Sequence, residues 1–339
     1  MTTHAPYAPP LSQKGIHPQS NEAPVAPFEK WYGWPKGHGS CSSVKAFAPS
    51  SLVLREYEMI HPGGDVTHRI PVCVFLIKHA ATGEYALFDL GLWNDWSDTI
   101  APEQRENYDV FEVNVEEDLD KVLEKQGVKL EDIKVIVVSH HHFDHCGTLR
   151  FHAFPHARVI VGPETRNKIY AVESLSNVTE LSWHHSPTQV ASFEHSYDVW
   201  GDGSFLVVAT PGHTPGHVSG LVRVSAPAEG SGSAGQYVLL AADCCHSGLL
   251  LHPPAGQTHL RIGRWRKPDE PISEPPKHSM HDDLLQAEFS LERVKAAERR
   301  DEIMVVLAHD KRRWDLWGGP KATLTGLELA DWRKKGLKR

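Results

Sequence analysis

The segment SHHHFDH brings together the side chain types that proteins most often use to hold divalent metal ions. If the chain is still extended where it leaves a strand, alternate side chains point the same way, so His140 and His142 project together while His141 points away. A turn directly afterwards brings Asp144 and His145 to the same place. Imidazole nitrogens and carboxylate oxygens are ligands of zinc and similar ions. The segment therefore offers two pairs of ligands, enough to begin two adjacent metal sites.

Three later segments each end an apolar run with one more potential ligand. His213 stands in TPGHTPGH after the run FLVVA, Asp243 follows YVLLAA, and His309 comes shortly after IMVVL. Each ion needs about four ligands, one of which is water when the site is catalytic. We therefore expect these three side chains to complete the sites that the first segment begins. The alternative is a histidine-rich loop without metal, and four ionisable side chains at one strand end argue against it.

The ligands need strands and helices that carry them to one place. Runs rich in β-branched and aromatic residues between Gly and Pro turns predict strands, and apolar residues at helical spacing predict helices. The run IKVIVV is apolar almost throughout, as in a strand buried on both faces, and it leads straight into the histidines. Strands are predicted over 52–60, 72–79, 84–91, 133–138, 158–161, 205–209, 217–224, 237–242 and 303–307, and helices over 115–126, 164–171, 281–299 and 321–335.

The composition divides the chain into three parts. Residues 1–40 are predicted to be a Pro-rich N-terminal arm that wraps the domain or is partly disordered. Residues 41–318 are predicted to form the main α/β domain, and 319–339 a C-terminal helix with a basic tail. Within the main domain, residues 252–279 are Pro-rich and irregular. A long irregular segment in a compact domain is more often a functional loop than a boundary, so we expect a pocket wall or a lid there.

Charge, hydropathy and cysteine content exclude several classes of protein. The chain has 35 basic and 43 acidic side chains and a formal net charge of −8, which argues against nucleic acid as a partner. It has neither a run near the roughly 18 apolar residues that span a bilayer nor an N-terminal signal sequence, so we expect no membrane contact and a cytoplasmic location. Five cysteines without a CxxC pair predict reduced thiols and neither a disulfide framework nor a thiolate zinc site.

With these motifs in order, the chain resembles the metallo-β-lactamase superfamily over roughly residues 52–317. The resemblance rests on the motifs HxHxDH and GHTPGH, on the strand-end aspartate and on the strand-end histidine. It implies an αββα sandwich and two divalent metal ions, zinc in the first place, with iron or manganese as alternatives. Asp89, in FDLG, occupies the position of an early aspartate that supports a metal ligand from behind. The implied ligands are His140, His142 and His213 for one ion and Asp144, His145 and His309 for the other, with Asp243 bridging them.

The resemblance also implies hydrolysis of a small-molecule substrate. The strand-end aspartate and the phenylalanine in SHHHFDH are similar to the quorum-quenching lactonase branch, which favours a small cyclic ester or amide, a lactone or lactam, opened by a hydroxide that bridges the two ions. Asp144 is the predicted proton carrier. Lactonases of this branch often carry a tyrosine three residues after the bridging aspartate, where this chain has His246, so His246 is a candidate to bind the substrate carbonyl or protonate the leaving group.

Two other functions remain open at this point. A glyoxalase-II-like thioesterase would be expected to add a C-terminal helical domain, and about thirty residues follow His309. An inactive metal-binding scaffold would be expected to lack ligands, and every position is filled. The oligomeric state, monomer or homodimer, is open as well.

Several neighbouring side chains are expected to support the site without binding metal. His141 and His217 are expected to pack or to orient ligands. Cys146, Cys244 and Cys245 are expected to be small buried side chains. For the three side chains Arg261, Arg264 and Trp265, a solvated basic loop and a pocket lining are both open.

Overall fold

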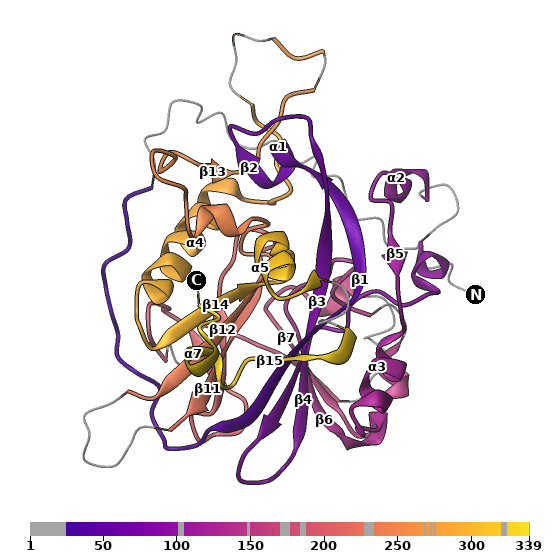
Figure 1. Ribbon diagram of the computed structural model, residues 1–339, viewed down its shortest axis with the longest axis vertical. Helices are drawn as coiled ribbons and strands as arrows, with labels where there is room; N and C mark the ends of the chain where they lie inside the picture. The colour runs from indigo at the N-terminus through magenta and orange to yellow at the C-terminus, as the bar shows by residue number, and fades with distance from the viewer. Residues whose placement is uncertain are drawn as a thin grey trace.

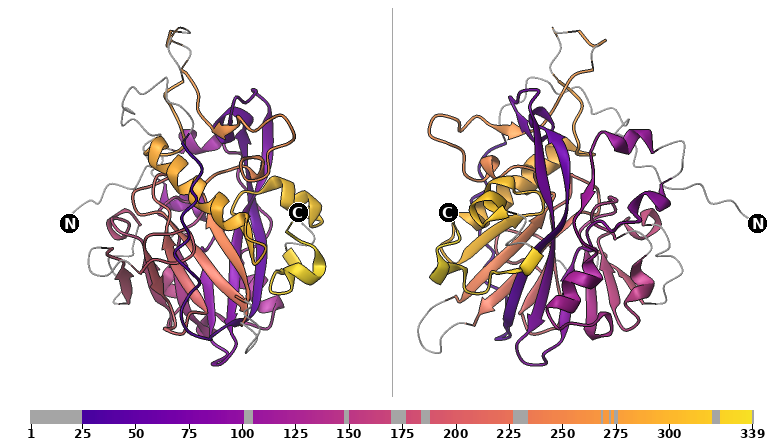
Figure 2. Two further views of the ribbon diagram at one scale, coloured as in Figure 1. Left: turned by 90° about the vertical axis from the view of Figure 1, so that its left-hand side faces the viewer. Right: turned by 45° about the vertical axis from the view of Figure 1, so that its right-hand side comes forward.

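The computed structural model describes residues 25–100, 105–147, 150–169, 177–183, 188–226, 234–267, 269–271, 273, 276–319 and 324–338. In this part of the chain two β-sheets lie face to face, and helices cover the outer side of each sheet (Figure 1, Figure 2). The predicted αββα sandwich is therefore confirmed. Among the residues described, no helix is both long enough and apolar enough to cross a lipid bilayer.

The larger sheet begins as an antiparallel meander and continues as a parallel sheet. Strands β1, β3 and β4 pair antiparallel, whereas β4, β6, β7 and β8 pair parallel. Parallel neighbours need a crossover connection, and α3 lies within the one between β4 and β6. In order across the sheet the strands are β15 (Leu327–Glu328), β1 (Cys41–Arg55), β3 (Thr67–His79), β4 (Tyr85–Phe88), β6 (Ile133–Val138), β7 (Arg158–Val161) and β8 (Val178–Glu180), and β5 (Asn114–Val115) pairs with β1.

The second sheet gathers several strand ends at one edge. Its strands β9 to β12 run antiparallel, and β14 runs parallel to β12. Because neighbours alternate in direction, the end of β10, the start of β11 and the ends of β12 and β14 meet at the same edge. The strands are β14 (Ile303–Leu307), β12 (Gln236–Ala242), β11 (Val218–Ser225), β10 (Phe205–Ala209) and β9 (Ser196–Asp198), and a separate ribbon pairs β13 (Arg261–Ile262) with β2 (Ile60–His61).

The helices lie on the two outer faces, and α4 is the longest of those described. Its N-terminus is capped by Asp283, whose side chain accepts a hydrogen bond from the backbone N–H of Gln286. Its apolar side buries Leu291 and Val294 against the second sheet. The helices are α1 (Glu56–Met59), α2 (Glu106–Asp109), α3 (Leu119–Lys125), α4 (Leu284–Glu298), α5 (Lys311–Leu316) and α7 (Trp332–Lys335), with short 3-10 turns η1 (Trp96–Thr99), η3 (Leu130–Asp132), η4 (Arg150–Ala153), η5 (Arg166–Lys168) and η7 (Gly248–Leu250).

Apolar side chains fill the space between the sheets. Phe75 and Phe88 of the larger sheet and Phe205 and Val207 of the second sheet are fully buried in one cluster. The rings of Phe75 and Phe88 meet edge to face, with centroids 6.3 Å apart. Each such side chain stabilises the fold by about 1.5–3 kcal/mol through burial alone. This packing fixes the two sheets, and hence their strand ends, relative to each other.

Two of the predicted helices are wrong. Within 164–171 the described chain forms only the turn η5, and residues 170–171 lie outside the described part. The Glu180 carboxylate accepts the N–H groups of Thr165 and Arg166 at the start of this turn. Within 321–335 the described chain is helical at 324–325 and in the single turn α7, but β15 lies between these two pieces, so no continuous helix forms; residues 321–323 lie outside the described part. Glu328 accepts the N–H of Val44, so this segment joins the edge of β1 instead of staying helical.

The described end of the predicted arm is held against the second sheet. The ring of Trp34 stacks on that of Tyr237 with centroids 5.1 Å apart. The buried guanidinium of Arg223 donates hydrogen bonds to the carbonyls of Pro35, Gly37 and Gly39. Residues 1–24 of the predicted arm lie outside the described part.

Candidate metal centre

The strand ends of both sheets deliver the predicted ligands to one edge. His140 and His142 follow β6 of the larger sheet. His213 lies in the turn between β10 and β11, Asp243 follows β12, and His309 follows β14. Because β6 belongs to one sheet and the other strands to the second, the face-to-face packing of the sheets brings these side chains together. The predicted positions are therefore adjacent in space, as the order of the motifs indicated.

The turn that carries His213 is fixed by a close approach to α4. Gly212 has φ +128°, and a Cβ atom at this position would lie 2.2 Å from the backbone nitrogen of Ala287. Only glycine accommodates both the backbone conformation and the contact. The sequence TPGH therefore specifies how deep His213 sits in the molecule.

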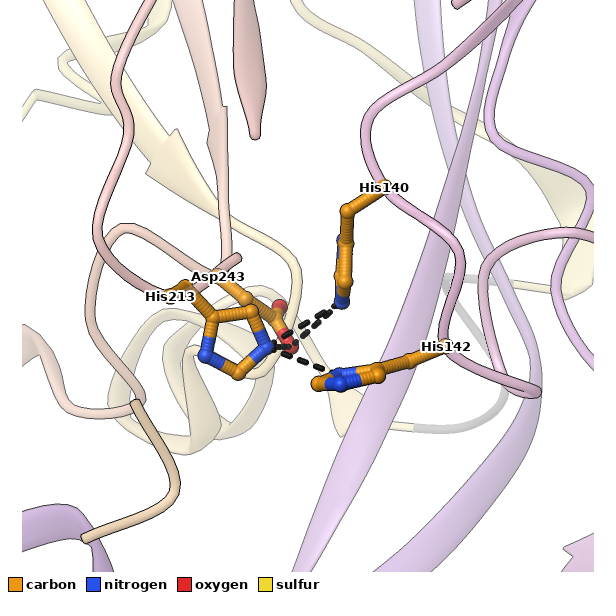
Figure 3. Close-up of side chains that lie close together, drawn as sticks. All are labelled: His140, His142, His213 and Asp243. Carbon is orange, nitrogen blue, oxygen red and sulfur yellow. Dashed lines mark hydrogen bonds and ion pairs between the residues drawn. The ribbon is translucent and has the colours of Figure 1, made fainter. Parts of the chain in front are cut away.

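Three imidazoles and one carboxylate form the first cluster, which we define as His140, His142, His213 and Asp243. His213 Nε2 lies 3.1 Å from His140 Nε2 and 2.9 Å from His142 Nδ1. Asp243 Oδ2 lies 3.4 Å from His213 Nε2 and 3.8 Å from His140 Nε2. Figure 3 shows the two histidines of one segment facing His213 and Asp243 across a small gap. Ring nitrogens bound to one tetrahedral zinc ion lie roughly 3.3 Å apart, so this spacing fits a single cation.

The second cluster consists of Asp144, His145 and His309. Asp144 Oδ2 lies 3.5 Å from His145 Nε2 and 3.3 Å from His309 Nε2. Asp243 reaches this cluster too, with Oδ2 3.2 Å from His145 Nε2 and Oδ1 3.3 Å from His309 Nε2. Asp243 therefore lies within ion-pair distance of histidines of both clusters, as expected of a bridging carboxylate.

Hydrogen bonds to a side chain and to the backbone orient the two histidine rings of the second cluster. His145 Nδ1 lies 2.8 Å from Asp89 Oδ2, and Asp89 also accepts hydrogen bonds from the N–H and the hydroxyl of Ser139. His309 Nδ1 lies 2.7 Å from the carbonyl oxygen of Pro71. These contacts occupy Nδ1 of each ring and turn Nε2 toward the cluster. Histidines that bind metals are held in this manner in known metal sites, and Asp89 has the place predicted for it.

The electrostatics of both clusters suit a cation. Burial lowers the pKa of His142 to about 4, so this ring is neutral and keeps its lone pairs. Burial acts the same way on His309, but the negative charges of Asp243 and Asp144 prevail and raise its pKa to about 10. The pKa of Asp243 is held well below its usual value, because the nearby histidine charges outweigh burial. Carboxylates this deep in the molecule require positive charge beside them, and a divalent ion supplies it.

Unpaired polar atoms point to the same conclusion. His145 Nε2 and Asp243 Oδ1 are buried, and although each lies 3.2–3.3 Å from an oppositely charged group, neither makes a well-aligned hydrogen bond in the described part of the chain. A buried polar atom without a partner costs about 1–3 kcal/mol. The donors present, imidazole nitrogens and carboxylate oxygens, are those that bind zinc and other first-row ions. The residues therefore fit divalent metal ions.

Of the neighbouring side chains, His217 supports the site as expected. His217 Nδ1 lies 2.9 Å from Thr210 Oγ1, and His217 Nε2 accepts the backbone N–H of Asp243 at 3.2 Å, which helps to fix the bridging residue. His141 is buried and belongs to neither cluster. All five cysteines are free and buried, and burial raises the pKa of Cys245 to about 12, so its thiol stays protonated.

A cavity of about 120 Å³ opens beside the clusters. Trp265 lies in its wall, as one interpretation of the loop 252–279 predicted, whereas Arg261 and Arg264 bind the buried carboxylate of Glu288 instead. Most of the wall is apolar. It is lined by Leu52, Leu54, Asn107, Tyr108, Phe111, His142, Phe143, Asp144, Asp243, Trp265, Ser279, Met280, Asp282 and His309.

Sequence reasoning missed one histidine at this edge. His281 is fully buried, and its ring centroid lies 4.9 Å from that of His213 and 5.3 Å from that of His246. It stands just after the Pro-rich segment 252–279, at the first residue of the predicted helix 281–299 and not at the end of an apolar run, so the strand-end pattern could not find it. The one available signal was the high histidine content, 23 of 339 residues. His246, the predicted catalytic residue, is also buried and lies beside Asp243, with Nε2 3.2 Å from Oδ2, but it is not among the residues that line the cavity.

Comparison with known proteins agrees with this geometry. Residues 69–224 match the model of the metallo-beta-lactamase superfamily, a range that includes five of the seven predicted ligands. Gamma-lactamase FDB1 of Fusarium pseudograminearum is 28% identical over 281 residues, 70% of this chain and 65% of that protein. Cytochrome P450 monooxygenase mpaDE of Penicillium brevicompactum is 28% identical over 307 residues, 78% of this chain but 32% of that protein. The chain thus spans less than two thirds of the length of each.

A solved structure gives the same fold. The quorum-quenching N-acyl homoserine lactone lactonase superposes with a TM-score of 0.56 at 17% sequence identity, over 81% of this chain and 95% of that chain. The layered sheets, the ligand-bearing strand ends and the family match lead to one conclusion. This chain carries a metallo-beta-lactamase superfamily domain.

Proposed function

We propose that this protein is a two-metal hydrolase that opens a small lactone or lactam. The observation that carries the proposal is the pair of buried ligand clusters joined by Asp243 at the wall of a cavity. The names of the gamma-lactamase and lactonase relatives support the choice of a cyclic amide or ester. The small and mostly apolar cavity suits a compact substrate with one polar carbonyl end.

We assign the first cluster to one divalent ion and the second cluster to the other, with Asp243 shared. Zinc is the proposed metal, and iron or manganese remain alternatives because they take the same nitrogen and oxygen donors. When bound, two such ions lower the pKa of a water molecule between them and polarise a carbonyl oxygen.

The chain's own residues perform the remaining tasks. Asp144 contributes a carboxylate to both the second cluster and the cavity wall, so it is placed to accept a proton at a carboxylate oxygen and return it to the leaving group. The apolar wall around Phe143 and Trp265 excludes water from the substrate body. His246 is also proposed as a hydrogen-bond donor to the substrate carbonyl, a role that it can have only while its ring binds no metal ion.

A hydrolysis assay on a panel of lactones, lactams and thioesters tests the proposal. We expect turnover of cyclic substrates that stops on chelation and returns with zinc, and no turnover by Asp144→Asn. Asp118→Asn, an acidic residue of the same type that belongs to neither cluster, is the matched control and should keep full turnover. A metal-replete protein that is inert on the whole panel would favour the scaffold, and turnover of thioesters alone would favour the thioesterase.

A further inference from the structure

Two buried histidines beside the clusters have no hydrogen bonds. His246 is 2% exposed and His281 is 0% exposed. Neither ring nitrogen of either side chain has a hydrogen-bond partner among the residues described, although His246 Nε2 lies 3.2 Å from Asp243 Oδ2. Buried polar groups in native proteins nearly always have a partner, and leaving one without costs about 1–3 kcal/mol. Two imidazoles in this state indicate that something other than the polypeptide pairs with them.

His213 completes a group of three imidazoles around one point. The ring nitrogens of His213, His246 and His281 lie within 4.8 Å of one another. The three rings are inclined steeply, with interplanar angles of 61°, 75° and 78° for the three pairs, so edges meet faces and the rings do not stack. Rings packed only for apolar contact have no reason to bring their nitrogens together. Nitrogens that converge without hydrogen bonds match the donor arrangement of a metal site.

His213 offers a second nitrogen to such a site once its ring gives up its remaining N–H proton to solvent and binds the two ions as an imidazolate. Its Nε2 faces His140 and His142 in the first cluster, at 3.1 and 2.9 Å. Its Nδ1 is buried and also has no hydrogen-bond partner in the described part of the chain. In the second cluster, by contrast, the outer nitrogens of His145 and His309 are both engaged, by Asp89 and by a backbone carbonyl. In His213, therefore, the ring nitrogen that orients the other two ligands makes no hydrogen bond in the described part of the chain.

The backbone holds the three histidines in place. Asp282 and Asp283 donate their N–H groups to the carbonyls of His213 and Gly212, at 3.1 and 2.9 Å. These two bonds tie the segment that carries His281 to the turn that carries His213. The N–H of His281 itself donates to the Ser279 hydroxyl. The spacing of the ring nitrogens is thus built into the fold and does not depend on a mobile loop tip.

We propose that His213, His246 and His281 form a third divalent-cation position, composed of three imidazole donors, at the edge of the two-metal centre. The proposal rests on the proposed function, because His213 is shared with the first cluster. Three nitrogen donors select zinc and neighbouring first-row ions over Mg²⁺ and Ca²⁺, which prefer oxygen. The position contains no carboxylate of its own, so it binds its ion more weakly than the two clusters joined by Asp243.

Equilibrium dialysis of the full chain against Zn²⁺ alone tests this position. The protein is first stripped with a chelator, then dialysed at rising zinc concentration, and the zinc bound per chain is determined by elemental analysis. We expect two tight equivalents and a third, weaker one. His281→Leu should lose the third equivalent and keep the two tight ones. The control His141→Leu removes a buried histidine that is adjacent to a ligand in sequence but belongs to none of the metal-binding groups. This variant should bind three zinc equivalents.

The possible failures are distinguishable. The third position is overturned if His281→Leu still binds a third zinc equivalent, or if the unaltered chain saturates at two zinc equivalents. Either result leaves the two-metal centre intact. Saturation below two equivalents overturns the two-metal centre and, with it, this inference. If His281→Leu does not fold, titration of the unaltered chain with Co²⁺ decides: visible absorption that grows through a third equivalent supports the position, and absorption that stops at the second overturns it.

Discussion

Asp89 supports the second cluster without belonging to it, and Asp89→Asn should weaken zinc binding there by about 10–100-fold. The carboxylate accepts three hydrogen bonds: from the N–H of Ser139 at Oδ1 (2.7 Å), from the hydroxyl of Ser139 at Oδ2 (2.9 Å), and from Nδ1 of His145 at Oδ2 (2.8 Å). An amide has the same shape, but only one of its two terminal atoms accepts hydrogen bonds. At least one buried donor must then face an NH₂ group.

The magnitude follows from this one mismatch. A buried donor left without its acceptor costs about 1–3 kcal/mol. Because about 1.4 kcal/mol corresponds to a tenfold change in an equilibrium constant, this cost equals roughly a 5- to 150-fold change. Asp89 and Ser139 are 1% and 0% exposed, so water cannot replace the missing partner. The unpaired donor belongs to Ser139 or to His145, so the cost falls on the segment 139–145 that positions the ligands and hence on the dissociation constant of the ion that His145 Nε2 binds.

Competition with a chromophoric chelator measures the two zinc dissociation constants. Asp202→Asn is a matched control, because Asp202 Oδ2 also lies 2.8 Å from a histidine ring nitrogen, that of His79, but in neither cluster. We expect this control to lower the free energy of unfolding and to leave both zinc constants unchanged. Unchanged zinc constants in Asp89→Asn, or equal weakening by both variants, would refute the assignment of Asp89 as the support of His145.

Three further outcomes are expected. Gly212→Ala should lower the free energy of unfolding by roughly 2–5 kcal/mol, because its φ is positive and its new Cβ would overlap Ala287. The control Gly127→Ala, with φ +70° and nothing near its Cβ, should lose only about 1–2 kcal/mol from backbone strain. Urea titrations measure both free energies, and equal losses would contradict the close contact. Chelation should lower the thermal midpoint, since ions bound at a thousandfold excess over their dissociation constant stabilise by about 4 kcal/mol each, and an unchanged midpoint in calorimetry would argue against buried ions. His246→Tyr should shift the ratio of lactone to lactam turnover, and an unchanged ratio would show that this side chain does not bind the scissile carbonyl.

Much of the site was predictable because its ligands obey a local rule. His213, Asp243 and His309 each stand within a few residues of the end of a fully apolar run, and the structure confirms strands at β10, β12 and β14. Such short apolar runs favour buried strands, and the first polar residues after a buried strand lie at the edge of its sheet. The meeting of these edges depends on the pairing of the strands, which the periodicity alone does not reveal. The order of the motifs resembles that of the metallo-β-lactamase superfamily, and this resemblance predicted that the strand ends meet.

The wrong helices show where local rules fail. Residues 321–335 contain apolar and basic residues that suit a helix, yet Glu328 pairs with β1, a strand almost three hundred residues earlier in the chain. Gly326, with φ +83°, lies against the Phe47 ring and breaks the segment before that pairing begins. A contact between such distant segments leaves no trace in the spacing of neighbouring side chains. Tertiary pairing therefore overrides helix propensity at this edge.

His281 was missed for the same physical reason, and its position shows how the site extends beyond the strand ends. The hydrogen bond from the N–H of Asp283 to the carbonyl of Gly212 docks the start of α4 onto the turn that carries His213, and this docking puts His281 next to a predicted ligand. The contact needs glycine at position 212, since any Cβ there would meet the backbone of Ala287. Gly212→Ala should consequently disturb the third cation position as well as the fold. A fold that survives this substitution with all zinc equivalents retained would show that the turn and α4 are not coupled in the way the site requires.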